Sequence, residues 1–382
     1  MEVVNTVLYS YSISISFLIV AILSPLLSGI ADYGGNKKSF LKFFTLLGSV
    51  CSALLFFFNG KNVEFGITCS VLASVGYSGS LVFYNAYLPE ITTKDNFDQV
   101  SARGYSFGYV GSVLLLVLSF ITIEFYEILG FSSELQAVRL SFLLVGVWWL
   151  VFAQISFYYL PKTQRSSYPV WKLISKGQQE IMKVVVELRR FRSMKFYLIA
   201  FFFYISGVQT IMFLAATFGD KELKIESSKL IATVTVIQLV AIAGAYLFAS
   251  ISKKQGNQRS LLYMLAIWVG VCIAAYFINS EVEFYILATI IGLIMGGIQS
   301  MSRSTFSKLI PEGSIDNTSY FSFYDVTEKL AIVVGTFAYG AIEQFTGSMR
   351  NSALFLVVFF LAGIVFLLAS KINVGRLKHF NS

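Results

Sequence analysis

The chain has 382 residues, 56% of them apolar and only 13% charged, with a mean hydropathy of +0.71. A soluble domain carries about 25% charged residues, so this composition excludes an ordinary soluble protein and predicts a membrane protein. We attribute the net charge of +8 to the basic residues that set the orientation of a membrane protein. We therefore expect no nucleic-acid binding.

Apolar runs of about 20 residues, the length that a helix needs to cross a bilayer, recur along nearly the whole chain. The first run is too long for a cleaved signal peptide and lacks a basic leader, so we interpret it as a membrane span. The sequence predicts eleven spans, at about 7–30, 40–59, 64–88, 104–125, 138–160, 195–217, 229–251, 260–279, 283–305, 319–344 and 350–370.

The turn between the first and second spans, residues 25–38, is short and charged. Asp32 closes the first span, Gly35 interrupts the helix, and Lys37 and Lys38 precede the second span. A tight, charged hairpin of this kind links neighbouring transmembrane helices in one class of transporter. We therefore expect a membrane carrier in which these four residues act in gating.

Basic residues set the orientation of the spans. When Lys37 and Lys38 are placed in the cytoplasm, loops and span ends on that side hold most of the 29 Lys and Arg residues. The opposite side holds Lys61, Arg139, Lys221, Lys224, Lys229 and Arg350. The C-terminus then lies inside and, with eleven spans, the N-terminus lies outside.

Residues 161–194 form the one long polar stretch and are rich in Lys and Arg. Apolar residues recur there at helical intervals, among them Trp171, Ile181 and Leu188. We predict an amphipathic helix at the cytoplasmic surface with its basic face toward anionic lipid. A binding site for a regulatory partner is the alternative.

This linker divides the chain into an N-terminal half, 1–160, with five spans and a C-terminal half, 195–382, with six. The third span closes with Tyr-Asn-Ala-Tyr-Leu-Pro-Glu-Ile (84–91) and the ninth with Thr-Phe-Ser-Lys-Leu-Ile-Pro-Glu (305–312). Both Pro-Glu pairs fall on the cytoplasmic side, so the second half reads as a copy of the first. Parallel repeats of this kind are the organisation of major facilitator transporters.

Residues 23–38 resemble the loop signature between the second and third helices of major facilitators, although Ser28 and Asn36 replace its usual leading glycine and its arginine. The whole chain is similar to the vacuole effluxer-like group of that superfamily, which is named for its autophagy-related yeast members. The segments that carry this similarity are Tyr-Asn-Ala-Tyr-Leu-Pro-Glu-Ile (84–91), Ser-Ala-Arg-Gly-Tyr-Ser-Phe-Gly-Tyr-Val-Gly (101–111), Gly-Val-Gln-Thr (207–210), Gly-Gly-Ile-Gln-Ser-Met-Ser-Arg-Ser-Thr-Phe-Ser-Lys-Leu-Ile-Pro-Glu (296–312) and Phe-Tyr-Asp-Val-Thr-Glu-Lys (323–329).

The resemblance implies an all-α membrane protein of the major facilitator fold, with two pseudo-repeated helical halves around a central polar cavity. It implies a secondary active transporter, a monomer, that moves a small solute such as amino acids or related metabolites by alternating access. Members of the group usually have one more helix before the first span seen here, so we expect about 11 of the usual 12. The short loops favour a bacterial inner membrane. A non-transporting membrane receptor or assembly protein derived from this fold is the alternative function.

Three charged residues lie within the tenth span. Asp325, Glu328 and Lys329 are spaced i, i+3 and i+4 and share one helical face. If the helix enters the membrane near Tyr320, Lys329 lies roughly 14 Å deep, at about 1.5 Å per residue. One interpretation is a proton-titratable or substrate-pairing site, because charges at that depth usually face a cavity or each other. The other is a self-neutralising ion pair that locks the two halves.

Two arginines are further gating candidates. Arg103 occupies the position in the first half that Asp325 occupies in the second, and a salt bridge between them when the cytoplasmic side closes would make a bistable element. An ordinary contact of Arg103 with lipid phosphate is the alternative. Arg303 is either a gating residue or an anchor at the cytoplasmic surface.

Neutral polar residues within spans are the candidate substrate ligands. The resemblance places them at the central cavity, and buried amides need hydrogen-bond partners. Hydrogen bonds between helices are the alternative for each of them. These residues are Tyr84, Asn85, Gln209, Thr210, Gln238 and Gln299.

The sequence gives little support for an enzymatic function. The sequence holds no His-based metal motif, no phosphate-binding glycine loop after a strand and no nucleophile elbow. Cys51, Cys69 and Cys272 lie inside spans without metal-ligand spacing, and the single His379 lies in the C-terminal tail. We therefore expect no enzyme activity, no cofactor and no metal site.

Overall fold

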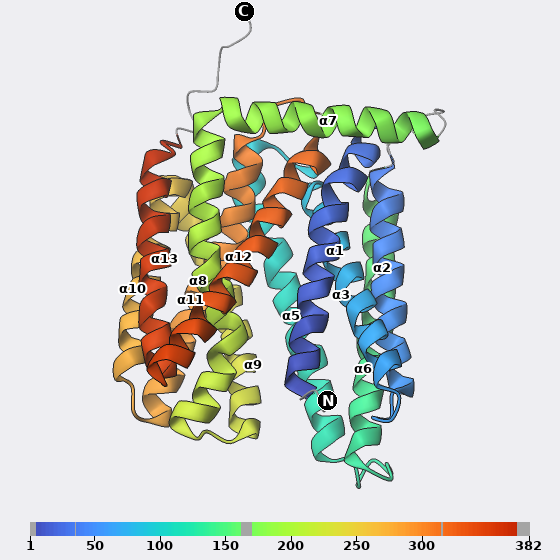
Figure 1. Cartoon of the computed structure of the whole chain (residues 1–382), viewed down its shortest axis with the longest axis vertical. Helices are drawn as coiled ribbons and strands as arrows, with labels where there is room; N and C mark the ends of the chain where they lie inside the picture. The colour runs from blue at the N-terminus through green and yellow to red at the C-terminus, as the bar shows by residue number, and fades with distance from the viewer. Residues whose placement is uncertain (1–4, 35, 162–169, 315, 373–382) are drawn as a thin grey trace, which may run out of the picture. The chain divides into compact units, whose positions relative to one another are not determined.

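The computed structural model describes residues 5–34, 36–161, 170–314 and 316–372. Within these ranges the chain is helical and contains no strand (Figure 1). The helices are α1 (Asn5–Gly34), α2 (Lys37–Leu54), α3 (Val63–Asn85), α4 (Leu88–Ile91), α5 (Phe97–Glu124), α6 (Glu134–Tyr159), α7 (Val170–Arg190), α8 (Arg192–Leu223), α9 (Ser227–Gln255), α10 (Asn257–Phe277), α11 (Glu281–Leu309), α12 (Asn317–Thr346) and α13 (Met349–Ala369), with short 3₁₀ turns at Leu55–Phe57 and Lys94–Asn96.

Ten of the described helices are long and apolar enough to cross a membrane: α1, α2, α3, α5, α6, α8, α9, α10, α11 and α13. An eleventh, α12, has 30 residues and carries Asp325, Glu328 and Lys329 within its length. The prediction of an all-α membrane fold with about 11 long helices is therefore confirmed.

The chain forms two compact units that do not follow the simple division of the sequence at the linker. Unit 1 contains Met1–Ile91, Leu114–Val185 and Ser314–Val326. Unit 2 contains Thr92–Val113, Val186–Gly313 and Thr327–Ser382. The start of α5 thus packs with helices of the C-terminal half, and the start of α12 packs with helices of the N-terminal half. The contacts of these two exchanged helix starts are described below.

In unit 1, α1 and α2 pack along α3, and α2 also packs along α6. Gly48 of α2 and Gly76 of α3 meet so closely that a side chain on either would collide with its neighbours. Apolar contact does little to drive helix association in lipid, and small residues that allow such close packing take its place. Phe44 and Phe83 stack beside this crossing with ring centroids 5.8 Å apart.

In unit 2, α9 packs along α11, α8 along α13, and α10 along both α11 and α13. Gly244 and Gly296 bring α9 and α11 together, since a side chain on either would collide with the opposite backbone. Trp268 of α10 stacks on Phe360 of α13 at a centroid distance of 5.5 Å. The polar C-terminal half of α11 lies buried within this unit.

The described part of the linker contains helix α7, which runs crosswise to α1 and α2 at their ends (Figure 1). Gly177 and Val184 of α7 are buried, whereas Met182, Lys183 and Val186 are exposed. The buried and exposed positions follow helical spacing, so α7 is amphipathic. The rest of the predicted linker, residues 162–169, lies outside the described residues.

Candidate functional site

The predicted gating hairpin contacts the start of α12 within unit 1. Asp32 lies near the end of α1, and its Oδ1 accepts the backbone N–H of Thr318 at 3.1 Å. Its Oδ2 accepts the backbone N–H of Ser319 at 2.6 Å and the Ser319 hydroxyl at 2.8 Å. The first N–H groups of a helix have no partner inside that helix and favour negative charge. Asp32 therefore caps α12 from a helix that is distant in the sequence.

The two lysines of the hairpin are also engaged. Lys37 is 4% exposed and forms an ion pair with Glu90 of α4. Glu90 also accepts from the amide of Asn317, the first residue of α12, at 3.5 Å. Lys38 donates to the carbonyl oxygen of Leu160, just after α6, at 2.7 Å.

Asp32 and, through Glu90, Lys37 thus contact the start of α12, whereas Lys38 contacts the end of α6. Gly35, the fourth gating residue predicted in the hairpin, lies outside the described residues. Sequence reasoning missed Glu90 as a gating candidate, although the repeated Pro-Glu pair at the ends of two spans marked it.

Unit 2 contains a second buried network, at the start of α5. Asp98 accepts from the hydroxyl of Ser252 at 2.9 Å, the amide of Asn257 at 2.9 Å and the ammonium of Lys308 at 2.7 Å. Lys308 also donates to the amide oxygen of Asn257 at 2.8 Å. None of the four residues is more than 8% exposed. The carboxylate is therefore fully enclosed and receives one charged and two neutral donors.

The two networks correspond to each other, but the acidic residue lies on the hairpin in unit 1 and on the incoming helix in unit 2. In unit 1 the carboxylate is on the hairpin, at Asp32, and the incoming helix α12 supplies the donors. In unit 2 the carboxylate is on the incoming helix, at Asp98 of α5, and the α9–α10 hairpin and α11 supply the donors. Asp98, Ser252, Asn257 and Lys308 were not predicted, because the second hairpin lacks the acidic residue that makes the first one recognisable.

Arg303 lies between α11 and α5 and is 4% exposed. Its Nε and Nη2 donate to the hydroxyl and the carbonyl oxygen of Ser101, each at 3.0 Å. Its guanidinium carbon lies 4.7 Å from the ring centroid of Tyr105. This burial contradicts the surface-anchor alternative for Arg303, because the charged group is enclosed by α5. Arg103 is exposed on α5, and its salt bridge with Asp325 stays a prediction.

Two predicted polar residues of unit 2 form hydrogen bonds between helices. Gln209 of α8 donates its side-chain amide to Glu328 of α12 at 2.7 Å. Tyr109 of α5 donates its hydroxyl to Gln299 of α11 at 2.6 Å. Glu328 lies roughly 16 Å along α12 from its start, at about 1.5 Å per residue. One candidate substrate ligand and one candidate coupling residue therefore meet midway along their helices.

Tyr109 also belongs to a small apolar cluster of unit 2. It packs with Ile237 and Met295, and Tyr105 and Met212 cover the cluster. Helices α5, α8, α9 and α11 thus each contribute a residue to this cluster. Sequence reasoning missed Tyr109, because an aromatic residue in a span is more often a packing residue than a ligand.

Two further candidate substrate ligands of unit 2, Thr210 and Gln238, have no part in the Gln209–Glu328 and Tyr109–Gln299 hydrogen bonds. Thr210 is fully buried against Gly335 of α12, which has no room for a side chain. Gln238 is half-buried on α9, next to Ile237 of the Tyr109 cluster. Substrate binding by both residues stays a prediction.

Tyr84 and Asn85 lie at the end of α3 in unit 1, with Tyr84 39% exposed and Asn85 9% exposed. Asp325 and Lys329 are buried on α12. Both interpretations of the charges on α12, a titrating site and a self-neutralising pair, stay open. Among the described residues, no group of three His, Cys, Asp or Glu side chains is placed to hold a metal ion.

Comparison with known proteins covers almost the whole chain. Residues 1–379 match the family model described as vacuole effluxer Atg22 like. The uncharacterised MFS-type transporter YxiO of Bacillus subtilis is 30% identical over 370 residues, 95% of this chain and 84% of the relative. Autophagy-related protein 22 of Yarrowia lipolytica is 24% identical over 455 residues, 97% of this chain and 76% of the relative.

Solved structures of several transporters share the helix arrangement of this chain. FucP, a major facilitator superfamily (MFS) transporter in the outward conformation, has a TM-score of 0.74 at 14% identity, covering 98% of this chain and 92% of that one. A bacterial homologue of the iron transporter ferroportin in its outward-facing state has a TM-score of 0.65 at 15% identity, covering 95% and 89%. Identities this low establish a shared fold and nothing finer.

Proposed function

Because the chain belongs to the vacuole effluxer Atg22-like family of MFS transporters, we propose that it moves a small polar solute by alternating access and couples this movement to protons through Glu328. The chain is a multi-pass integral membrane protein with the major facilitator fold.

The hydrogen bond between Gln209 and Glu328 carries the proposal. An ionisable side chain midway through the hydrocarbon is expensive and marks a functional site by default. The amide of glutamine has both donor and acceptor groups, so Gln209 can bond to Glu328 when the carboxyl group is ionised and when it is protonated. A partner of this kind lets the carboxyl group gain and lose a proton without losing its hydrogen bond.

The predicted polar residues of unit 2 favour a solute that is polar and small. Amide groups come from Gln299 and Gln238, and a hydroxyl group comes from Thr210. Tyr109 contributes a phenolic hydroxyl together with its aromatic ring. Amino acids are the first solutes to test, because the family is named for vacuolar efflux. A bacterial inner membrane is the proposed location, given the Bacillus subtilis relative.

The Asp32 and Asp98 networks supply the gate in this proposal. Alternating access requires contacts that hold one side shut and then separate. Both networks join the start of one helix to a hairpin of the opposite half, on the side that the basic residues assign to the cytoplasm. Opening toward the cytoplasm breaks them together.

Flux measurements in reconstituted vesicles test the coupling. Labelled amino acids are offered to the wild-type protein with and without a pH gradient, and protein-free vesicles are the blank. The Glu328→Gln variant should lose stimulation by the gradient but keep exchange of labelled for unlabelled solute. Glu343→Gln makes the same chemical change on α12 near its other end, where Glu343 meets Lys221 at 3.4 Å, and should behave as wild type.

Three results would count against parts of the proposal. A wild-type flux that ignores the pH gradient would exclude proton coupling, and an unchanged response in Glu328→Gln would exclude Glu328 as its site. Flux no greater than in protein-free vesicles would favour the alternative, a non-transporting receptor or assembly protein.

A further inference from the structure

Helix α7 makes two contacts with the same elements that Asp32 joins. Its Gly177 meets Gly29 of α1 backbone to backbone, so that a side chain on either glycine would collide with the other helix. Six residues further along α7, Lys183 reaches Asp316, which directly precedes α12, at 2.6 Å. All of these residues belong to unit 1. Helix α7 is therefore a second connection between α1 and the start of α12.

The ion pair between Lys183 and Asp316 is unequal in its exposure. The side chain of Asp316 is 4% exposed, whereas that of Lys183 is 51% exposed. The second carboxylate oxygen of Asp316, Oδ1, has no hydrogen-bond partner among the described residues. When Lys183 moves away from Asp316, the buried carboxylate loses its charged partner. The ion pair therefore strongly favours the state in which α7 is bound to the start of α12. The ammonium group, in contrast, can be reached from the cytoplasmic surface.

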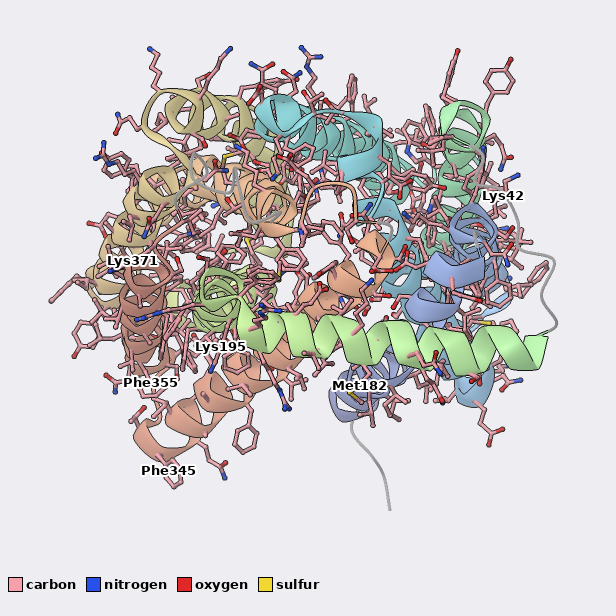
Figure 2. The ribbon with its side chains drawn as sticks, turned by 90° about the horizontal axis from the view of Figure 1, so that it is seen from above. Lys42, Met182, Lys195, Phe345, Phe355 and Lys371 are labelled. Atoms are coloured by element: carbon pink, nitrogen blue, oxygen red, sulfur yellow. The ribbon has the colours of Figure 1, made fainter. Side chains whose placement is uncertain are left out.

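The outer face of α7 has the chemistry of a helix that meets a membrane surface. Met182 and Val186 lie one helical turn apart and are 62% and 57% exposed. Exposed basic residues flank them: Lys183, Arg189 and Arg190. Figure 2 shows α7 from above, with Met182 near its middle. Apolar residues between basic ones bind at the interface of anionic bilayers, through buried apolar area and charge attraction.

We propose that α7 is a lipid-responsive strap on the cytoplasmic gate: anionic phospholipid headgroups draw Lys183 away from Asp316 and so release the start of α12. The inference rests on the proposed gating function and adds its regulation. On neutral lipid the strap stays fastened by Gly177 and Lys183, and the Asp32 contact is stabilised. On anionic lipid the headgroups replace Asp316 as the partner of Lys183, and the gate opens more often.

A thiol at Thr318 reports the opening without solute. The Thr318 side chain is fully buried, and its contact with Asp32 uses the backbone N–H, which Thr318→Cys preserves. The three natural cysteines, Cys51, Cys69 and Cys272, are replaced by alanine. The labelling rate with a membrane-impermeant maleimide is then measured in vesicles of neutral phosphatidylcholine and in vesicles with about one-third phosphatidylglycerol, a lipid content at which basic segments bind.

The strap predicts a pattern across variants. The Thr318→Cys protein should label several-fold faster on anionic lipid. Adding Lys183→Gln should give fast labelling on both lipids, and Lys183→Arg should restore slow labelling on neutral lipid, which shows that the variants fold. Arg189→Gln with Arg190→Gln should label slowly on both lipids. Lys195→Gln, which removes an exposed charge at the start of α8 (Figure 2), should respond as the parent does.

Equal labelling of the parent on the two lipids would overturn the lipid response. Slow labelling of Lys183→Gln on neutral lipid would overturn the strap itself. Faster labelling in neutral vesicles on addition of inorganic phosphate would overturn the assignment to lipid, because a soluble anion would then be enough. Labelling needs no solute, so failure of the transport assay and failure of this inference are separate results.

Discussion

The carboxylate of Asp32 accepts both the backbone N–H and the hydroxyl of Ser319, at 2.6 and 2.8 Å. A side chain of α1 therefore acts as the N-cap of α12, in place of the local residue that usually does so. A cap borrowed from another helix is lost whenever the two helices separate. This contact consequently couples the stability of the first turn of α12 to the state of the proposed gate.

Asp32→Asn should loosen the gate. The amide retains one oxygen acceptor but loses the negative charge, and hydrogen bonds to charged groups contribute about 1.5–3 kcal/mol each. Loss of one such contribution corresponds to a rise of roughly 10- to 100-fold in the open population. The labelling rate of Thr318→Cys should rise accordingly. Asp220→Asn, at an exposed position near the end of α8, is the matched control, and equal rates in the two variants would contradict the capping role.

The Asp98 network should show strong pairwise coupling. Removing one member of a buried ion pair is destabilising by about 3–5 kcal/mol, because the other charge is left without compensation. Lys308→Met and Asp98→Asn should each lower the melting temperature of the purified protein clearly, and the double variant should lose much less than the sum.

The exposed pair Lys221–Glu343, at 3.4 Å, provides the reference cycle, with an expected coupling below about 1 kcal/mol. Additive losses at Asp98 and Lys308 would show that the two residues do not form a functional pair.

The fold could be predicted from the sequence to a large extent. Runs of about 20 apolar residues locate membrane helices because every backbone group in hydrocarbon must be bonded within its own helix. The signature around Asp32 and the repeated Pro-Glu pairs then indicated the superfamily and the repeat. The family and the fold are both confirmed.

The partners within the site could not be predicted to the same extent. Lys308 and Asp98 are far apart in the sequence, and each is individually an ordinary charge near the end of a span. Only the exchange of the α5 and α12 starts between the two units brings such residues together. The hydrogen bond between Gln209 and Glu328 could likewise not be predicted, although each residue was selected separately because it is polar within an apolar span.

Gln209→Leu should reduce transport at least about 10-fold. Leucine has a similar size but leaves Glu328 without its donor, and an unsatisfied buried polar group is destabilising by about 1–3 kcal/mol, more when it is charged. The measurement is solute flux in vesicles, compared at equal protein content. Gln154→Leu is the control, because Gln154 is exposed on α6 and donates within its own helix, to the carbonyl oxygen of Leu150. Unchanged flux in Gln209→Leu would remove Gln209 from the coupling site.

Gly177→Ala should detach α7 from α1. The added methyl group would lie 2.7 Å from the backbone nitrogen of Ile30, and backbone that close cannot yield as a flexible side chain would. Overpacking of this kind typically destabilises by about 1–3 kcal/mol, and here the strain is relieved when α7 lifts. Thr318→Cys should then label faster even on neutral lipid. Gly340→Ala on α12, where a methyl group meets open space, should leave the rate unchanged, so a similar rise in both variants would mean that added bulk alone explains the effect.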